Sequence, residues 1–422
     1  MSNTGFGVSF ETDGPETRPT AQAEFSDIGL ALVAPDKAGG LEFNRPYAVN
    51  SNDVDFYTAL GVGGNARAEI EGINDQLSEF RKSAKLSVVL VDEGDNADPA
   101  VKLTETLNNL KGDSVQKTGI HAWKNSAQLT GRTPRLCAVP GYTSQQTESN
   151  VANIVCAELP AVLNSLMAVA FVDGPNSTRQ AALDWRETMS SKRLIPIETA
   201  VKVANSDGDV VVAPASSRVA ALQLGIDQSK DGLPFHTAAM RALNIVGPGR
   251  EMEFDLADFS TEGQELYNNN LGIVVRGEAG SDSAAAEGGF VYIGTDTCST
   301  DPLWRFYNQV RGRDYLHVMA IRDLRNLLGK YNISIQLAQT WITMQRARLN
   351  MLVRKNAILG FQVQFVADEN DPLDIRKGRL SISMDAEESA PFVHGHIKSG
   401  RYSVAVDEFV SDLIAGFDQQ AI

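Results

Sequence analysis

Cysteine and histidine are scarce in this chain, which has 3 Cys and 5 His among 422 residues. The three cysteines, Cys137, Cys156 and Cys298, are far apart and form no CxxC pair. A disulfide framework is therefore not expected, and so sparse a set is typical of reduced thiols in a cytoplasm. A bridge between subunits stays open, although nothing in the spacing favours it.

Long hydrophobic runs and an excess of positive charge are also missing. The N-terminus has neither a basic region nor an apolar run, so no secretory signal is expected. The longest apolar stretch, residues 159–172, is interrupted by Asn164 and is too short to span a bilayer. The formal net charge is −15, and a chain this acidic repels phosphate backbones. Neither membrane insertion nor nucleic-acid binding is expected.

The common catalytic motifs are absent from the sequence. Gly329 and Lys330 lack the upstream glycine and the hydroxyl residue of a phosphate loop. The glycines of residues 61–64 follow a helix pattern, not a strand, which favours a helix end over a dinucleotide loop. His394 and His396 would share one strand face, but no third metal ligand is marked near them. We therefore assign no catalytic, cofactor or metal residue and do not expect an enzyme.

An α/β rhythm is present from residue 28 to about residue 250. Apolar runs predict buried strands, and polar segments with apolar spacing predict helices between them. Such repetition indicates a mainly parallel sheet covered by helices, with a less regular stretch at residues 92–130. The expected strands are 28–33, 86–91, 136–141, 168–172, 193–196 and 209–214, and the expected helices are 53–60, 147–166 (kinked or divided at Pro160) and 177–189.

The pattern changes near residue 250 and indicates an α+β region over residues 251–406. A short helix at 260–268 has Ser260 as its expected N-cap. Residues 271–276 and 290–294 form a predicted hairpin around a Gly/Ser/Ala loop. Two longer helices are expected at 301–330 and 334–359, followed by strands at 361–366, 379–384, 394–397 and 402–406. The fold class is thus α/β followed by α+β.

Both chain ends look like extended arms, at residues 1–27 and 407–422. Phe6, Val8 and Phe10 alternate with small or polar residues, as one face of a strand does. A single strand on a tether is not stable alone and needs a sheet edge to join. Phe6, Val8 and Phe10 at one end and Phe409, Leu413 and Phe417 at the other are therefore the predicted residues of strand donation between subunits.

One segment opposes the acidic character of the chain. Residues 301–360 hold ten Arg or Lys and three acidic residues, a net charge of +7. Arg346, Asn350 and Arg354 fall at i, i+4 and i+8 of a predicted helix and share one face. The segment is either a solvated face with intramolecular salt bridges or a docking surface for an acidic protein. Nucleic acid is a weaker third alternative.

A series of short motifs between residues 209 and 315 resembles the contractile tail sheath proteins of phages and of related bacterial injection systems. No single piece is diagnostic, whereas their order over about a hundred residues is fairly specific, and residues 43–47 and 53–61 resemble the family's early segment more loosely. The pieces are Val212-Ala213-Pro214-Ala215-Ser216-Ser217, Gly225-Ile226-Asp227, Gly232-Leu233-Pro234-Phe235-His236, Leu243-Asn244-Ile245-Val246-Gly247-Pro248, Leu266 to Ile273, Gly294-Thr295-Asp296-Thr297 and Trp304 to Tyr315.

The resemblance implies a structural subunit without an active site. Sheath proteins of this family form hexameric rings stacked helically around a tube, with the C-terminal domain against the tube and the terminal arms adding strands to neighbouring subunits. Contraction drives the tube through the host envelope for genome ejection. The implied partners are further copies, the tail tube protein, and baseplate and tail terminator proteins. The implied location is the virion tail, after assembly in the host cytoplasm.

Three interpretations remain open at this point. The first is the phage sheath, with Arg346, Asn350 and Arg354 facing the tube as a hypothesis. The second is the sheath of a bacterial phage-tail-like bacteriocin or injection system. The third is an α/β enzyme whose site is not recognised.

Overall fold

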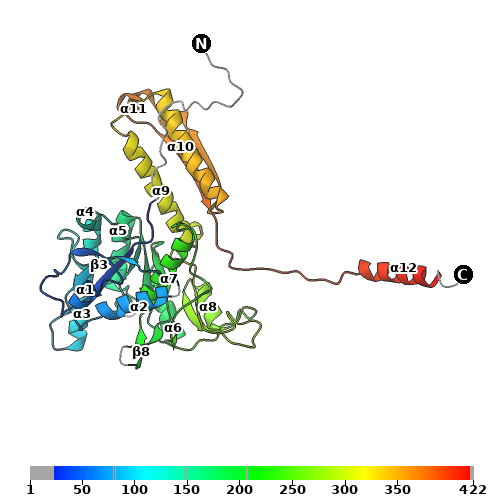
Figure 1. The fold of residues 1–422 in the computed structure, drawn as a ribbon, viewed down its shortest axis with the longest axis horizontal. Coiled ribbons are helices and arrows are strands. Elements are labelled where there is room, and N and C mark those ends of the chain that lie inside the picture. Colours follow the sequence, from blue (N-terminus) through cyan, green and yellow to red (C-terminus); the bar gives the residue numbers. More distant parts are fainter. Residues whose placement is uncertain are drawn as a thin grey trace, which may run out of the picture. The chain divides into compact units, whose positions relative to one another are not determined.

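The computed structural model describes residues 23–78, 80, 82–146, 148, 150–205 and 208–418. The chain divides into two units, Met1–Ala390 and Pro391–Ile422, and each is described by itself. The first unit contains an α/β body and a helix–hairpin part that projects from it, as the ribbon shows (Figure 1).

A six-stranded sheet forms the centre of the body, with the order β2-β3-β1-β4-β5-β6. Strand β1 (Ile28–Val33) is buried throughout and pairs in parallel with both β3 (Lys85–Val91) and β4 (Leu136–Ala138). β5 (Val169–Asp173) and β6 (Leu194–Ile197) continue the parallel ladder, whereas β2 (Pro46–Asn50) is an antiparallel edge. The predicted mainly parallel sheet is confirmed.

Both faces of the sheet are covered, which explains why its strands read as continuous apolar runs. Ile28, Leu30 and Leu32 of β1 point to one core, and Ala31 and Val33 point to the other. The first core is closed by α2 (Ala66–Ser78) and α7 (Ser216–Ser229), which pack on each other. The second is closed by α3 (Pro99–Lys111), the 3-10 helix η1 (Gly119–Asn125), α5 (Ile154–Leu166) and α6 (Arg179–Glu187). Helix α4 (Ser126–Thr130) follows η1 and contacts β2.

Helix α5 differs from the expectation for residues 147–166. It begins at Ile154, because the Asn153 side chain accepts hydrogen bonds from the backbone N–H groups of Val155 (2.8 Å) and Cys156 (3.2 Å). An N-cap of this kind satisfies donors that a helix end leaves open. Pro160 lies inside α5, which runs on to Leu166 as one helix. The helix is therefore not divided near Pro160, and the alternative, a kink there, stays a prediction.

The glycine-rich loop after α1 (Val54–Ala59) packs against the sheet. It follows a helix and is not the strand-to-helix turn of a phosphate-binding loop. Gly64 has φ +78°, and a Cβ there would lie 2.1 Å from the carbonyl oxygen of Val33. The next residue, Asn65, accepts from Val33 N and donates to Pro140 O, each at 2.9 Å. The loop therefore follows a helix, as predicted, and holds two strand ends together.

Residues after β6 form smaller antiparallel sheets. β8 (Val210–Ala213) pairs antiparallel with β7 (Val201–Ala204) beside β10 (Gly247–Pro248), so the strand predicted at 209–214 exists but lies outside the parallel sheet. The predicted hairpin is confirmed as β11 (Ile273–Arg276) with β12 (Phe290–Ile293), next to β9 (Arg241–Ala242). Helix α8 (Glu262–Asn268) begins after Thr261, not after Ser260.

Helix α9 (Tyr307–Leu327), helix α10 (Ile335–Arg354) and the hairpin of β13 (Ile358–Phe365) and β14 (Ile382–Glu388) form what we call the helix–hairpin module. Both helices are shorter than predicted. Residues 302–304 form the separate 3-10 helix η2, and extended backbone at Phe306 precedes α9. Asn356, with φ +56°, follows α10 and turns the chain into β13. The hairpin tip carries η3 (Ala367–Glu369) and α11 (Pro372–Arg376).

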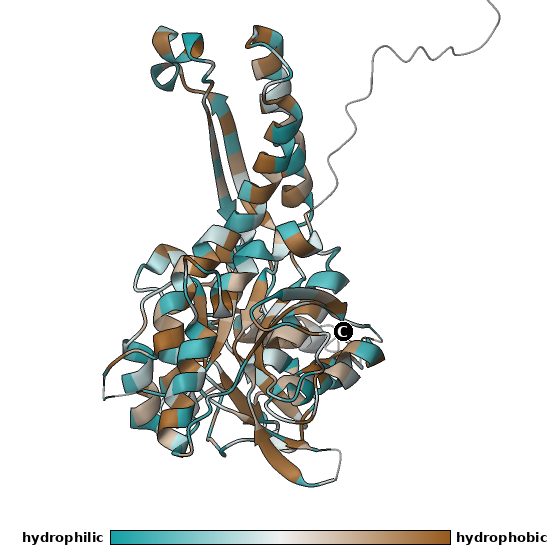
Figure 2. Ribbon diagram, turned by 90° about the vertical axis from the view of Figure 1, so that its left-hand side faces the viewer, coloured by the Kyte–Doolittle hydropathy of each residue, from teal (hydrophilic) through white to brown (hydrophobic). Residues whose placement is uncertain are grey.

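The module stands away from the α/β body (Figure 2), and the hydrophobic core at its base also contains Phe25, Leu233 and Phe235 from outside the module. Tyr315, Met319, Leu349 and Val363 belong to this core. Residues 271–310, by contrast, contribute to the two cores of the body. The division expected near residue 250 therefore does not coincide with a division of the hydrophobic core. The predicted boundaries of the arms and domains in an assembled sheath, at residues 27, 250 and 406, stay a prediction.

In the described part of the second unit, helix α12 (Val404–Asp418) is the one regular element. The strands predicted at 394–397 and 402–406 are wrong for the chain taken alone. Gly395 interrupts the first stretch, and neither strand forms in the described part of this unit. Apolar residues from Val406 onward recur every three or four positions, which is the period of a helix and not of a strand.

Candidate functional site

At the end of β5, the carboxyl edge of the parallel sheet, where open α/β sheets bind ligands, is occupied by the protein's own groups. Asp173 ends β5, and its carboxylate accepts hydrogen bonds from Ala215 N (3.0 Å), Ser216 N (2.8 Å) and Ser216 Oγ (2.6 Å). Burial raises the pKa of Asp173, and the hydrogen bonds oppose this rise. The carboxylate therefore caps the start of α7 and is engaged in structure.

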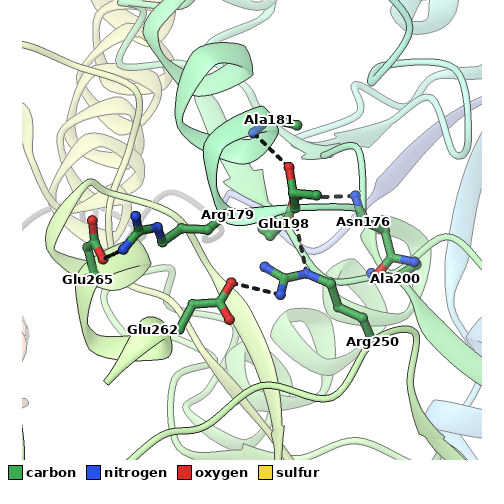
Figure 3. A network of polar contacts seen from close by, with 9 residues as sticks. Asn176, Arg179, Ala181, Glu198, Ala200, Arg250, Glu262 and Glu265 are labelled. Carbon is green, nitrogen blue, oxygen red and sulfur yellow. Dashed lines mark hydrogen bonds and ion pairs between the residues drawn. The ribbon is translucent and has the colours of Figure 1, made fainter. Parts of the chain in front are cut away.

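A second polar network lies beside this edge, around Glu198 (Figure 3). Glu198 follows β6, is fully buried, and accepts from Arg250 Nε at 3.2 Å and from Asn176 N at 3.3 Å. Burial raises its pKa to about 7, with Arg250 acting in the opposite direction. Arg250 also pairs with Glu262 of α8 at 2.8 Å. The Arg250 guanidinium thus pairs with both carboxylates and links the end of β6 to α8.

Arg179 of α6 and Glu265 of α8 add a parallel link at 2.6 Å (Figure 3). The network therefore joins α6, the end of β6 and α8. This arrangement stabilises the body and offers no nucleophile for catalysis.

The histidines and cysteines form no reactive cluster in the described residues. No group of three or more His, Cys, Asp or Glu side chains that could hold a metal ion occurs there. His394 and His396 are both exposed in the second unit. All three cysteines are free and buried, and burial raises the pKa of the Cys298 thiol to about 12. Among these residues, no helix is long and apolar enough for a membrane span.

The base of the helix–hairpin module is fixed to the body by buried polar contacts from the first turns of α9. Arg311 binds Asp227 of α7 through both carboxylate oxygens, one of them at 3.1 Å from Nη1. Arg313 makes a bidentate contact with Glu388 at the end of β14, at 2.6 and 2.9 Å. Because these contacts reach α7 and β14 together, they set the direction in which α9 leaves the body.

The two helices of the module are held together by Asp323. Its carboxylate accepts from Gln345 Nε2 at 3.0 Å and from Arg348 Nη2 at 2.8 Å, both on α10. The interpretation of the basic segment as a face with intramolecular salt bridges is therefore confirmed for at least five of its ten cations, which form ion pairs with carboxylates of the described residues. These five are Arg305, Arg311, Arg313, Arg348 and Lys355.

Arg346, Asn350 and Arg354 lie together on the exposed side of α10, opposite the buried Gln345 and Leu349. Arg346 donates to the carbonyl oxygen of Val363 from Nε (3.2 Å) and Nη2 (2.7 Å), so its guanidinium lies against β13. Within the described residues neither arginine of this face forms an ion pair with a carboxylate. Helix α10 itself contains no acidic residue. This face of α10 is thus positively charged and exposed to a binding partner.

The hairpin of β13 and β14 is a two-stranded sheet whose outer edges carry no third strand in the described part of the chain. Leu359 and Phe365 of β13 are 71% and 48% exposed. An isolated two-stranded hairpin is marginal in water and gains stability from further strands or from packing. Here α10 covers part of one face, and the edges remain free for pairing.

The N-terminal segment enters the structure at the side of α9. Phe25 is buried, stacks edge-on against Tyr315 at 5.5 Å between ring centroids, and lies under the guanidinium of Arg135 at 4.8 Å. Ala23 N donates to Met319 Sδ at 3.1 Å. Phe6, Val8 and Phe10 lie outside the described residues, so their part in strand donation stays a prediction. The first described residues, Ala23 and Phe25, are thus anchored on α9.

Phe409, Leu413 and Phe417 lie on α12, not on a strand. Phe409 is 61% exposed and Leu413 is 42% exposed, and Val410 and Ile414 beside them are exposed as well. A 15-residue helix with exposed apolar groups has little stability of its own and needs a partner surface. Strand donation by these residues in an assembly stays a prediction, and in the free chain they are helical.

No family model matches the chain. Two curated relatives do. It is 25% identical over 380 residues to a putative prophage major tail sheath protein of Pseudomonas aeruginosa (strain UCBPP-PA14), covering 89% of this chain and 90% of the relative. It is 23% identical over 392 residues to the tail sheath protein of Escherichia phage P2, covering 91% and 92%.

Solved structures agree with this fold. The sheath complex of an extracellular contractile injection system (PVC), in the contracted state, matches with TM-score 0.64 and 14% identity over 95% of this chain and 99% of that one. The baseplate of the anti-feeding prophage (AFP) includes a chain with TM-score 0.57 and 15% identity, over 94% and 98%. The likeness therefore extends over almost the whole chain.

The fold, the module and these relatives define a class of protein, the structural subunits of contractile sheaths. The resemblance to contractile tail sheath proteins is confirmed, and this chain is a contractile sheath subunit. Its relatives are components of phage tails or of phage-tail-like particles.

Proposed function

We propose that this chain polymerises as stacked hexameric rings around a tail tube and contracts to drive the tube through a host envelope for genome ejection. Assembly takes place in the host cytoplasm, and baseplate and tail terminator proteins bind the two ends of the polymer. The subunit performs no catalysis, since the work of the machine comes from rearranged contacts between copies.

The observation that carries this proposal is the helix–hairpin module, which presents three incomplete surfaces at once. These are the acid-free face of α10, the open edges of β13 and β14, and the N-terminal segment anchored on α9. Each surface needs a partner. A polymer around a tube supplies two kinds of partner, the tube and further copies of the chain. A lone soluble enzyme would have no use for them.

Tube binding is assigned to Arg346, Asn350 and Arg354. Exposed ion pairs contribute about 0–1 kcal/mol each, so one subunit holds an acidic strip on the tube weakly. Many subunits together hold it firmly, and the contacts still release one ring at a time. Weak repeated contacts of this kind suit a sheath that must let go of its tube on triggering.

Self-assembly is assigned to the hairpin edges and the two arms. A strand added to β13 or β14 forms backbone hydrogen bonds that contribute on the order of 1 kcal/mol each. Ordering an arm costs roughly 1–2 kcal/mol per residue, so apolar side chains such as Phe6, Val8 and Phe10 must also become buried. Tethered arms keep subunits linked while their bodies rotate.

A sheath of a bacterial bacteriocin or injection system is a second candidate, favoured by the likeness of fold to the PVC and AFP chains. The two candidates share every surface described above. Capsid and packaging genes beside the coding gene distinguish the phage, since a bacteriocin or an injection system has none.

Negative-stain microscopy of the purified chain, alone and mixed with the cognate tube protein, tests the proposal. We expect rings or tubes with a regular axial repeat, and longer tubes when the tube protein is present. Compact particles that stay monomeric at all concentrations and with the tube protein would overturn it.

A further inference from the structure

A basic hollow of about 560 Å³ lies where α9 passes the amino ends of β4 and β5. Its charged lining residues are Lys124, Arg135, Arg322 and Arg325, and the other lining residues are uncharged. We call it the basic groove. Four cations without a carboxylate among the lining residues are unusual in a chain of net charge −15. The groove plays no part in the contacts of the module base or of the α10 face.

Arg135 is built into this groove by the ends of other elements. Its Nη1 donates to the carbonyl oxygens of Leu166 and Met167, the latter at 3.2 Å, at the end of α5. Its guanidinium lies over the ring of Phe25, and its Nε is buried without a hydrogen-bond partner in the described residues. Burial lowers the pKa of Arg135 to about 10, so it remains charged at neutral pH. The cation is fixed in place and keeps unused donor capacity.

A second hollow, of about 680 Å³, has the opposite charge. Its charged lining residues are Asp92, Glu93, Asp95 and Glu105, and no lining residue is basic. Lys102 reaches Glu93 from outside the lining at 3.0 Å, which leaves the other three carboxylates without a cation among their described ion pairs. We call this surface the acidic pole. Asp92 and Asp95 are exposed and project from the loop between β3 and α3.

The two surfaces lie at opposite edges of the parallel sheet. Arg135 directly precedes β4, whereas Asp92 directly follows β3, and both strands run parallel to β1. A six-residue strand is about 20 Å long. One body therefore cannot bring its own acidic pole onto its own basic groove. A contact between the two surfaces therefore has to join different molecules. A linear polymer built by this contact has an unoccupied acidic pole at one end and an unoccupied basic groove at the other.

We propose that the basic groove of one copy binds the acidic pole, Asp92 to Asp95, of a second copy. Such a contact is heterologous, so it generates rings or helical polymers and not closed dimers. Copies of net charge −15 repel one another at long range, and opposite charges at the contact offset this repulsion and fix the register. The inference rests on the proposed polymer, but it concerns surfaces other than the arms and the tube-binding face.

Charge reversal tests the contact. Lys124→Glu with Arg325→Glu makes the groove variant, and Asp92→Lys with Asp95→Lys makes the pole variant. We expect each variant to raise the concentration needed for polymerisation, measured by sedimentation, about tenfold. In a combined variant with all four reversals the charges are complementary again, and assembly should return to near that of the parent chain.

Lys82→Glu with Lys230→Glu is the matched control, because it makes the same change in net charge on exposed residues away from the groove. If this control weakens assembly as much as the groove variant does, the effect is one of net charge and the inference fails. It also fails if the combined variant is as defective as either pair. A parent chain that forms no polymer contradicts the proposed function instead, so the two failures are distinguishable.

Cross-linking identifies the occupant directly. The three native cysteines are buried, so Asp95→Cys and Arg325→Cys, prepared as two separate chains, each add one accessible thiol. We expect a disulfide-linked dimer from mixed polymers of the two chains and none from either chain alone. Absence of the mixed dimer under conditions where polymers form would overturn the inference.

Discussion

Arg311 on α9 and Asp227 on α7 form an ion pair in which the side chains are 2% and 0% exposed. The two residues are 84 positions apart in the sequence, and the pair ties the projecting helix to the α/β body. Burial raises the pKa of Asp227, whereas the Arg311 guanidinium lowers it. A buried charge depends on its partner, and removal of only one member leaves the other uncompensated.

Asp227→Ala is therefore expected to lower the free energy of unfolding by about 3–5 kcal/mol. The double variant Asp227→Leu with Arg311→Met should lose less, because no buried charge remains. Urea denaturation followed by circular dichroism measures both. Asp374→Ala is the control, since its pair with Arg379 at 3.5 Å is solvent-exposed and should change stability by less than about 1 kcal/mol. A double variant worse than Asp227→Ala would contradict the argument.

Glu69 makes stability depend on pH. It is buried on α2, its carboxylate accepts from Ser217 Oγ, and burial raises its pKa from 4.5 to about 7. Between these values the folded state binds more protons than the unfolded state, so stability falls as pH rises from about 4.5 to about 7 and stays low above. Glu69→Gln should flatten part of this slope and stabilise the protein at pH 8 by roughly 1–3 kcal/mol.

Urea unfolding at pH 5, 6, 7 and 8 measures this slope. Glu198 and Asp27, whose pKa values burial raises to about 7 and about 6, act in the same direction and remain in the variant. Glu278→Gln, at an exposed position, should leave the profile unchanged. Equal slopes for the parent and Glu69→Gln would show that this carboxyl is ionised throughout.

Arg346→Glu with Arg354→Glu should weaken tube-templated assembly and leave the monomer folded. Both residues are exposed, and only the Arg346 contact with Val363 O is lost within the subunit. We expect a small decrease in melting temperature, below about 4 °C, and a loss of long tubes on tube protein at 0.15 M salt. Arg376→Glu with Lys377→Glu, at the C-terminal end of α11, is the charge-matched control. Normal templated assembly by the Arg346 and Arg354 variant would remove these residues from the tube contact.

Truncation after Ala390 should leave the first unit intact and abolish polymerisation. Residues 392–416 are exposed throughout, so their removal exposes no core. Calorimetry should give the same melting temperature, within about 2 °C, for the truncated and full chains. Phe409→Ser with Leu413→Ser should weaken polymerisation in the same direction. If the truncated chain polymerises normally, the C-terminal arm has no part in assembly.

The buried parallel strands were predictable, because a continuous apolar run such as residues 28–33 has few alternatives to a strand covered on both faces. Helix α2 carried a signal that was missed, since Ile70, Ile73 and Leu77 recur at helical spacing. The same spacing marks α12. Periodicity over a longer window would have identified both helices.

The polar contacts of the module were not predictable in the same way. Which of ten cations finds a carboxylate depends on segments as distant as Asp227 and Arg311, and no local pattern encodes that pairing. The ordered series that suggested a sheath contained both residues, in two of its separate pieces. Charge counting alone therefore overstated the positive surface, because at least five of the ten cations form ion pairs within the chain.

The helical state of α12 has a consequence for subunits that have not yet been incorporated. A helix engages its own amide and carbonyl groups, so the tail of a newly made subunit offers no loose β-strand for indiscriminate pairing. A polymer would then grow only where pairing with an open sheet edge is more stable than the helix. Aggregation of unassembled subunits would be suppressed.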